Sequence, residues 1–199
     1  KSNVSIDCRA ISNRVEKDLP FFQSDISTGI SGLSNFDSSH MQNTTVDTTT
    51  LEIFCEEKSL NRVDYLKIDT EGYDLFVLQG FPWKTVKKPI LVMCEFEDTK
   101  TTPLGYNFED IAEFLKIHGY KILVSEWFPV VRRGGPHKWK DFYTYESSIP
   151  SSDSWGNIIA VQGNENFDLL NEMAILVAKH WRIGNFLSEV RESILKTYS

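Results

Sequence analysis

The chain has 199 residues, of which 41% are hydrophobic and 25% are charged, and its formal net charge is -7. This balance suits one soluble domain with a sizeable core, and the acidic charge disfavours binding to nucleic acid through phosphate attraction. No apolar run reaches membrane-spanning length and no signal peptide is visible, while the three cysteines lack any CxxC spacing, so we predict a cytoplasmic protein with buried thiols and no metal site.

The first predicted strand lies near the start of the chain, where apolar and polar residues alternate over residues 4–9, as in a half-buried strand. Residues 20–45 are rich in Ser, Asn, Asp and Gly, which is typical of a loop. A loop of this length is either functional or mobile, and His40 within it is expected to be solvated. A short strand at 45–49 and a short helix at 51–59 follow.

The most informative segment is a predicted strand at 63–69 that leads through a turn into a helix at 73–80. In this helix the apolar residues recur at the spacing of one helix face. In open α/β sheets ligands bind at the carboxyl ends of strands, so Asp69 and Glu71 are candidate catalytic residues. The alternative is that Asp69 caps the helix and Glu71 is solvated near its positive end.

A second apolar run predicts a strand at 90–95, and its continuous hydrophobicity indicates that both faces are covered. Glu95 and Glu97 lie at its carboxyl end. Two acids there either hold a substrate hydroxyl and act as a base or are solvated residues at a strand exit. A helix is predicted over 107–119, because Asn107 is a good N-cap residue and a glycine ends the pattern.

Two more strands are predicted at 120–125 and 157–162, joined by a long excursion over 126–155. From residue 166 to the end, apolar residues keep helical spacing, and a break at Gly184 divides this part into two predicted helices. We interpret these apolar stripes as packing surfaces that cover the sheet or contact a partner domain.

The excursion concentrates aromatic and basic residues in an otherwise acidic chain. Aromatic faces stack on sugar rings, Arg pairs with carboxylate or phosphate oxygens, and His accepts a hydroxyl proton near neutral pH. We predict that Arg133, His137 and Trp139 form part of an acceptor pocket, with His137 catalytic, and that they face Asp69 and Glu95. The alternative is that the aromatic residues pack onto the sheet and the basic ones are solvated.

The stretch 64–72, DYLKIDTEG, resembles the signature of the FkbM family of methyltransferases. Flanking segments at 50–52, 89–95 and 119–120 extend this resemblance to most of residues 4–125. In the first of these segments the chain has Glu where the family has Asp.

The resemblance implies an α/β, Rossmann-like methyltransferase sheet that is mostly parallel with its last strand antiparallel. From the alternation of strand and helix patterns we further expect that residues 63–69 lie inside the sheet and do not form an edge strand. The resemblance divides the chain into a partial FkbM-like domain at 1–165 and a helical extension at 166–199. The chain has no G-x-G-x-x-G motif. The resemblance therefore implies that the glycine-rich cofactor loop lies in an upstream part of the same protein, before Lys1.

The resemblance also implies S-adenosylmethionine as cofactor and a hydroxyl of a sugar or natural product as methyl acceptor, so the partner is a small molecule or glycan. It places Ala10, Ile11 and Ser12 at the adenine pocket, although an ordinary strand exit explains them equally well, and it places Asp69 beside the cofactor. Two other functions stay open: a non-catalytic α/β domain that binds a glycan or protein partner, and a doubly wound enzyme that uses a nucleotide sugar.

Overall fold

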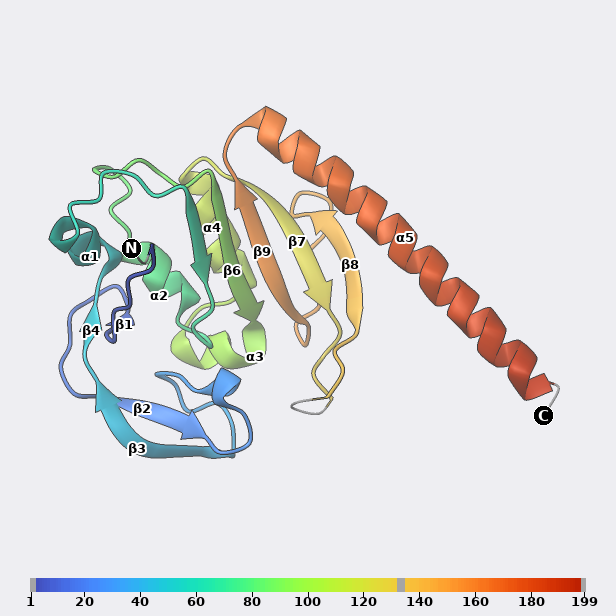
Figure 1. Ribbon diagram of the computed structural model, residues 1–199, viewed down its shortest axis with the longest axis horizontal. Helices are drawn as coiled ribbons and strands as arrows, with labels where there is room; N and C mark the ends of the chain where they lie inside the picture. The colour runs from blue at the N-terminus through green and yellow to red at the C-terminus, as the bar shows by residue number, and fades with distance from the viewer. Residues whose placement is uncertain (1–2, 132–134, 198–199) are drawn as a thin grey trace.

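The computed structural model describes residues 3–131 and 135–197. Over these residues the chain combines a five-stranded sheet and two two-stranded sheets with helices (Figure 1). The main sheet has the strand order β5-β6-β9-β7-β8. Its strands are β5 (Tyr65–Ile68), β6 (Leu91–Glu97), β7 (Lys121–Trp127), β8 (Trp139–Thr144) and β9 (Trp155–Val161). The α/β class is therefore confirmed.

The strand directions correct the expectation of a mostly parallel sheet. β5 and β6 are parallel, whereas β9 is antiparallel to both β6 and β7, and β8 is antiparallel to β7. The last strand does run antiparallel to its neighbours, as expected. The sheet is mixed because β9 inserts between β6 and β7, and because the long excursion supplies β8, which folds back along β7 as the second strand of a hairpin.

β5 lies at one edge of the sheet, so the expectation that residues 63–69 lie inside the sheet is wrong. No strand pairs with its outer side among the residues that the structure describes. An edge strand presents unpaired backbone N–H and C=O groups. Tyr65 is 50% exposed, whereas Ile68 is buried at the other end of the strand.

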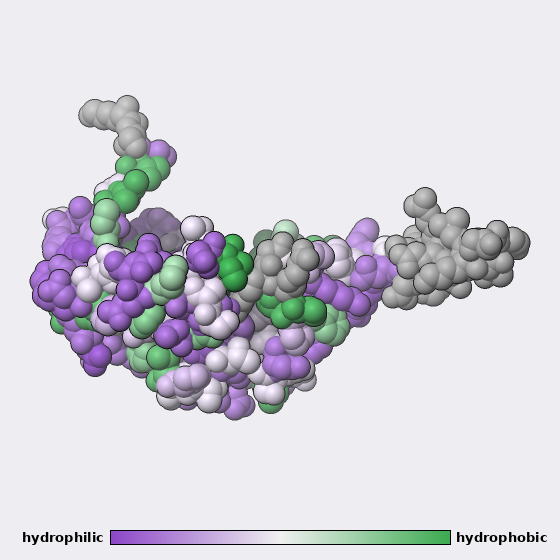
Figure 2. Space-filling model, turned by 90° about the horizontal axis from the view of Figure 1, so that it is seen from below, coloured by the Kyte–Doolittle hydropathy of each residue, from purple (hydrophilic) through white to green (hydrophobic). Residues whose placement is uncertain are grey.

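The N-terminal segment does not form the expected strand over 4–9. Val4 is 70% exposed and Ile6 is 85% exposed, and Figure 2 shows the segment extending away from the body of the molecule. The short strand β1 (Ala10–Ile11) instead pairs in parallel with β4 (Thr48–Thr49). The alternating pattern is typical of a strand, but no neighbouring strand in the described residues covers its apolar side.

Residues 20–45 are not an open loop. They contribute to an antiparallel hairpin of β2 (Leu19–Ser24) and β3 (His40–Val46), with the short 3-10 helix η1 (Thr28–Ile30) between the two strands. The overall composition is typical of a loop, yet aromatic residues in β2 and β-branched residues in β3 favour strands. This hairpin carries η1 toward the main sheet.

His40 is packed rather than solvated. Its ring lies 4.7 Å from the Phe36 ring and 6.2 Å from the Phe22 ring, measured between centroids. Its Nε2 lies 2.8 Å from the carbonyl oxygen of Ile30, while Nδ1 is buried without a hydrogen-bond partner in the described part of the chain. His40 therefore helps to fix the position of η1.

Short helices connect and cover the strands. They are α1 (Leu51–Glu57), α2 (Asp74–Gln79), α3 (Asp98–Thr101), the 3-10 helix η2 (Thr102–Leu104) and α4 (Phe108–Ile117). Thr50 caps α1 by accepting a hydrogen bond from the Ile53 N–H at 3.1 Å. Asn107 and Asp110 form a capping box at the start of α4, and Gly119, at φ 89°, follows its end. The predicted helices at 51–59, 73–80 and 107–119 are thus confirmed.

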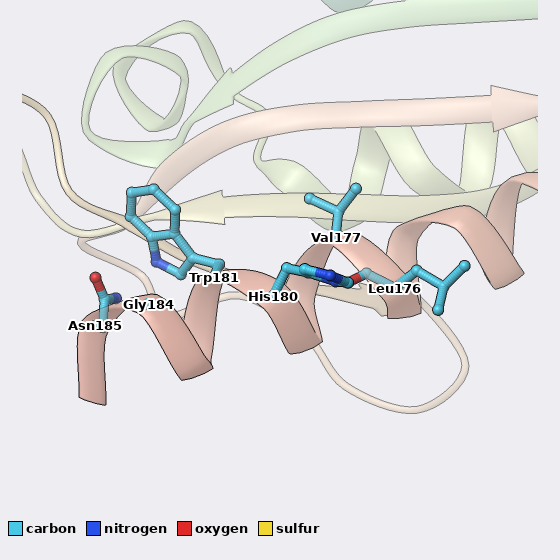
Figure 3. Close-up of a pocket in the computed structure, with 6 residues that line it drawn as sticks. All are labelled: Leu176, Val177, His180, Trp181, Gly184 and Asn185. Atoms are coloured by element: carbon cyan, nitrogen blue, oxygen red, sulfur yellow. The ribbon is translucent and has the colours of Figure 1, made fainter. Parts of the chain in front are cut away.

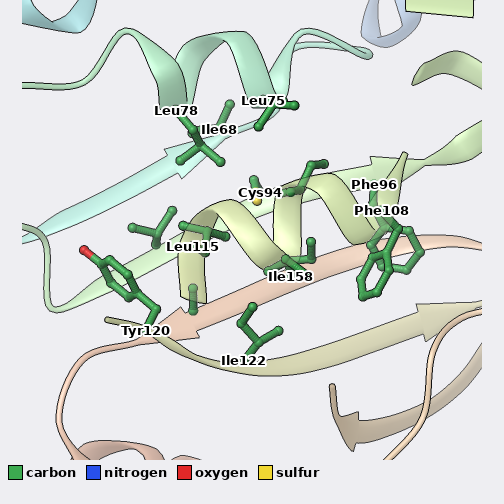
Figure 4. Close-up of a cluster of buried hydrophobic side chains, with 14 of the residues drawn as sticks. Ile68, Leu75, Leu78, Cys94, Phe96, Phe108, Leu115, Tyr120, Ile122 and Ile158 are labelled. Carbon is green, nitrogen blue, oxygen red and sulfur yellow. The ribbon is translucent and has the colours of Figure 1, made fainter. Parts of the chain in front are cut away.

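The core lies between the main sheet and the helices α2 and α4 (Figure 4). It includes side chains from both helices and from four strands: Ile68, Leu75, Leu78, Cys94, Leu115, Ile122 and Ile158. Cys55 and Cys94 are buried free thiols as expected, whereas Cys8 is exposed. This packing fixes the ends of β5 and β6, where the candidate site residues lie.

The C-terminal part forms one helix, α5 (Asn164–Thr197), so the expected break at Gly184 is wrong. A glycine within a helix costs only about 1 kcal/mol relative to alanine, and it does not by itself end one. α5 crosses beside β8 and then runs on past the sheet (Figure 1). In the described residues, no helix has the length and apolar character needed to cross a membrane.

Candidate active site

Acidic side chains meet at the carboxyl ends of β5 and β6. Ile68, the last residue of β5, lies opposite Cys94 of β6, so Asp69 follows β5 next to Glu95, which lies in the last part of β6. One carboxylate oxygen from each of Asp69, Glu71 and Glu95 lies within 4.8 Å of the other two. The structure therefore brings together the three candidate catalytic carboxylates.

A tight turn directs Glu71 into the protein. Glu71 has φ 53° and Gly72 has φ 101°, backbone angles that glycine adopts readily and other residues rarely adopt. The Tyr106 hydroxyl donates a hydrogen bond of 2.6 Å to the Gly72 carbonyl. As a result Glu71 is only 9% exposed, and the alternative that Glu71 is solvated is wrong.

Asp69 is the most accessible of the three carboxylates, since its side chain is 52% exposed. It accepts a hydrogen bond of 2.5 Å from the Lys67 ammonium. Asp69 does not cap the following helix, because the N-cap residue of α2 is Tyr73. Its carboxylate is therefore free of a structural role in α2.

Lys100 is the counter-ion of the buried acids. Its Nζ lies 2.6 Å from Glu71 and from Glu97, and 3.5 Å from Glu95. The lysine side chain is only 4% exposed. Burial alone would lower the pKa of Lys100, yet the carboxylates around it raise that pKa above its usual value. Lys100 therefore stays charged and neutralises only one of the three acids.

Two acids at this end of the sheet, Glu95 and Asp74, have a pKa above the usual value. Burial raises the pKa of Glu95 to about 8, and neighbouring carboxylates add to this shift against the opposing charge of Lys100. Burial also raises the pKa of Asp74 to about 6. Asp74 accepts hydrogen bonds from the Thr70 hydroxyl at 2.9 Å and from the Glu95 backbone N–H at 3.1 Å, and so connects the turn after β5 to the end of β6.

A cavity of about 240 Å³ opens beside these acids. Its walls come from η1, the end of β6, α3, the segment before β8 and the start of β9. The lining residues are Ser27, Gly29, Ile30, Glu71, Glu95, Glu97, Lys100, Val130, His137 and Trp155. The cavity combines carboxylates, an ammonium, an imidazole and an aromatic face, which suits a ligand with hydroxyl groups.

The three residues predicted from the excursion have different locations. His137 lines the cavity with Glu95, and its ring meets the Trp155 ring edge-on at 5.1 Å. Trp139 is buried elsewhere: its Nε1–H donates to the Ser125 hydroxyl at 3.1 Å, and its ring packs against Trp181 of α5. The expectation that Trp139 faces the acids is therefore not met, because it fills the space beneath α5. Arg133 lies outside the described residues.

The segment predicted for the adenine pocket lies at a different place from the acids. Ala10 and Ile11 form β1, and Ser12 is 3% exposed. A side chain at Gly80 would bring its Cβ within 2.3 Å of the Ser12 carbonyl oxygen, so the exit of β1 packs tightly on the carboxyl end of α2. Glu71 precedes the other end of that helix.

The sequence did not predict several residues that line the cavity, including Lys100 and Trp155. The spacing of Glu97 and Lys100 at i and i+3 was the available signal for an ion pair. The burial of that pair depends on the turn at Glu71, which spacing does not reveal. Ile30 lies in the segment for which a functional role was one of the two alternatives.

A known protein family matches the part of the chain that carries the acids. The family model described as the methyltransferase FkbM domain matches residues 2–122, a span that includes Asp69, Glu71, Glu95 and Lys100. No curated protein and no solved structure matches the chain. Because the matched residues make up more than half of the sequence, the chain belongs to the FkbM methyltransferase family.

Proposed function

We propose that this protein is an S-adenosylmethionine-dependent methyltransferase that methylates a hydroxyl group of a sugar or natural product. The observation that carries this proposal is the convergence of Asp69, Glu71 and Glu95 beside a cavity that His137 also lines, in a chain of the FkbM methyltransferase family. Methyl transfer to oxygen requires mainly the positioning of two reactants and the removal of one proton, and these residues suit both tasks.

The acidic cluster fits the proposed cofactor by its charge. When bound, S-adenosylmethionine supplies a methyl group on a positively charged sulfonium. Asp69 is half exposed beside two other carboxylates, and carboxylates favour a positive charge close by. We assign Asp69 to cofactor binding on this basis. A part of the protein upstream of Lys1 would complete the cofactor site, in keeping with the unpaired outer side of β5 in the described residues.

The cavity residues would handle the acceptor. Glu95 and His137 face the same space, so one holds the acceptor hydroxyl and the other accepts its proton. In this proposal His137 is the general base, and Glu95, protonated below its pKa of about 8, is a hydrogen-bond partner. Lys100 is a positioning residue, because it holds Glu71 and Glu97 at 2.6 Å. The buried free thiols Cys55 and Cys94 agree with a cytoplasmic, reducing location.

The test is transfer of a labelled methyl group from S-adenosylmethionine to a panel of sugars and polyketide-like alcohols, carried out with a version of the protein that is extended upstream of Lys1. We expect His137→Ala to lower the transfer rate by about 100-fold while the cofactor affinity stays unchanged. The matched control is Lys138→Ala, the next residue, whose ammonium lies over the Phe128 ring, and which is expected to retain activity. Glycan binding without any methyl transfer would instead favour the non-catalytic function.

A further inference from the structure

α5 has two apolar faces. The face toward the sheet buries Phe167, Ala174 and Ala178, and it is fixed by an ion pair between Arg182 and Asp141 of β8. A second set of apolar residues is exposed on the same helix. Four of these residues, Leu169, Met173, Leu176 and Ile183, form with His180 what we call the outer stripe, whereas the exposed Ile175, Val177 and Trp181 lie off it.

The outer stripe lies opposite the packed face. With 3.6 residues per turn, its positions cluster on the side of the helix that points away from the buried alanines. The exposed fractions are 60% for Leu169, 53% for Met173, 56% for Leu176 and 49% for Ile183. In Figure 3 Trp181 extends from α5 toward the strands, whereas Leu176 and His180 lie along the helix itself.

The spacing within the outer stripe is that of a coiled coil. Its five positions are separated alternately by four and three residues, the a and d positions of a heptad repeat. In the sequence the same spacing continues at Leu187, Val190 and Ile194. Such a repeat packs well against another helix that has the same repeat. The sheet of the same chain already covers the opposite face of α5, so the partner helix must come from another chain.

The charges on α5 argue against a membrane as the partner. Residues 164–197 contain five acidic and four basic residues, without the Lys and Arg excess that anionic lipid surfaces attract. The whole chain carries a net charge of -7, which adds repulsion from such a surface.

We propose that two copies of this chain pair through the outer stripes of their α5 helices, antiparallel and about a two-fold axis. Met173 then packs against Leu176 of the partner subunit, and each body lies on the far side of its own helix. In the heptad Glu172 and Lys179 both occupy g positions, which flank the stripe. This arrangement places Glu172 beside Lys179 of the partner subunit, and the same contact recurs by symmetry.

The expected interface is small. Each of the exposed side chains of the outer stripe, His180 included, contributes on the order of 100 Å², so the pair buries about 1,000 Å², at the lower limit for a specific interface. We therefore expect a dimer with a dissociation constant of about micromolar order. Its formation is a property of α5 and is independent of methyl transfer.

Sedimentation velocity over a concentration series of the 199-residue chain tests the proposal. Leu176→Glu should raise the dissociation constant by about 100-fold or more. The matched control is Ile175→Glu: Ile175 is the adjacent residue, 58% exposed, but lies off the stripe, and this variant should dimerise as the wild type does. Both substitutions are at exposed positions, and circular dichroism verifies the fold. A wild-type chain that stays monomeric at about 100 µM, or equal effects of the two substitutions, would overturn the proposal.

Charge reversal tests the antiparallel arrangement. Glu172→Lys alone and Lys179→Glu alone should each weaken the homodimer, by about tenfold at low salt. A mixture of these two variants should form a heterodimer, because both contacts are then complementary, and the double variant should recover the wild-type affinity. If the mixture forms no heterodimer and the double variant does not regain the wild-type affinity, the proposed pairing is wrong. Binding of a monomeric wild-type chain to anionic vesicles would also overturn it.

Discussion

Lys100 shares one buried charge among three carboxylates, and this makes it the residue on which the site most depends. We predict that Lys100→Met lowers the free energy of unfolding by about 3 kcal/mol at neutral pH, because it leaves buried acids without a counter-ion. Because the pKa of Lys100 is raised on folding, its stabilisation is complete below about pH 10 and is lost only as the pH rises through the raised value. Urea denaturation at pH 7 measures the effect.

The control for this prediction is Lys116→Met. Lys116 also forms a lysine–glutamate pair, with Glu113 at 2.9 Å, but both side chains are well exposed. Exposed pairs contribute little to stability because water and salt screen them. An equal loss of stability in the two variants would show that the buried acids do not require Lys100.

Glu95 gives a second prediction, on pH. Its pKa is about 8 in the folded protein, above the value of about 4.3 in an unfolded chain. The folded state therefore binds one more proton between these values, so stability falls as the pH rises through this window and levels off above it. Glu95→Gln removes this effect. Relative to the wild type, we expect Glu95→Gln to gain about 4 kcal/mol between pH 5 and pH 9 in urea denaturation. A pH-independent difference would contradict a raised pKa.

The space around a glycine differs between strand β9, which contains Gly156, and helix α5, which contains Gly184. A Cβ at Gly156 of β9 would lie 2.0 Å from the Ser125 carbonyl oxygen and 3.0 Å from the Phe96 ring, whereas a Cβ at Gly184 of α5 meets nothing within 4 Å. We predict that Gly156→Ala destabilises the protein by about 3 kcal/mol through overpacking. Gly184→Ala should instead stabilise α5 by up to about 1 kcal/mol. Thermal melts followed by circular dichroism compare the two, and a melting temperature lowered by Gly184→Ala would contradict a continuous α5.

At the level of elements, the sequence predicted helices better than strand pairing. Asn107 and Thr50 carry the capping signals of α4 and α1 in a few adjacent residues, so local pattern suffices for them. Strand pairing depends on distant segments: residues 4–9 have the alternation of a strand, yet no strand of the described residues pairs with them, and β8 arises within an excursion without a clear strand pattern. At Gly184 a local signal was misleading: the glycine predicted a break, but the packing and length of α5 keep the helix continuous.

Across the whole molecule, the position of the acids was predictable and their electrostatics were not. A strand followed by a turn and a helix places Asp69 at a strand end, and Glu95 lies near the end of β6. The burial of Glu71 requires the left-handed backbone of the turn, and its pairing with Lys100 requires α3 to fold back over β6. The place of Trp139 depended on α5, which lies outside the segment that resembles the family.

The last prediction follows from the open edge of the main sheet. The outer side of β5 has no partner strand in the described residues, the chain has no G-x-G-x-x-G motif, and Asp69 is half exposed. Calorimetric titration of the 199-residue chain with S-adenosylmethionine should therefore give weak or undetectable binding, while a version extended upstream of Lys1 should bind. Within the extended protein, Asp69→Asn should lower the cofactor affinity by about tenfold, because the carboxylate that complements the sulfonium is lost. Tight binding by the 199-residue chain alone would contradict this prediction, because Asp69, Glu71 and Glu95 would then hold the cofactor without any upstream segment.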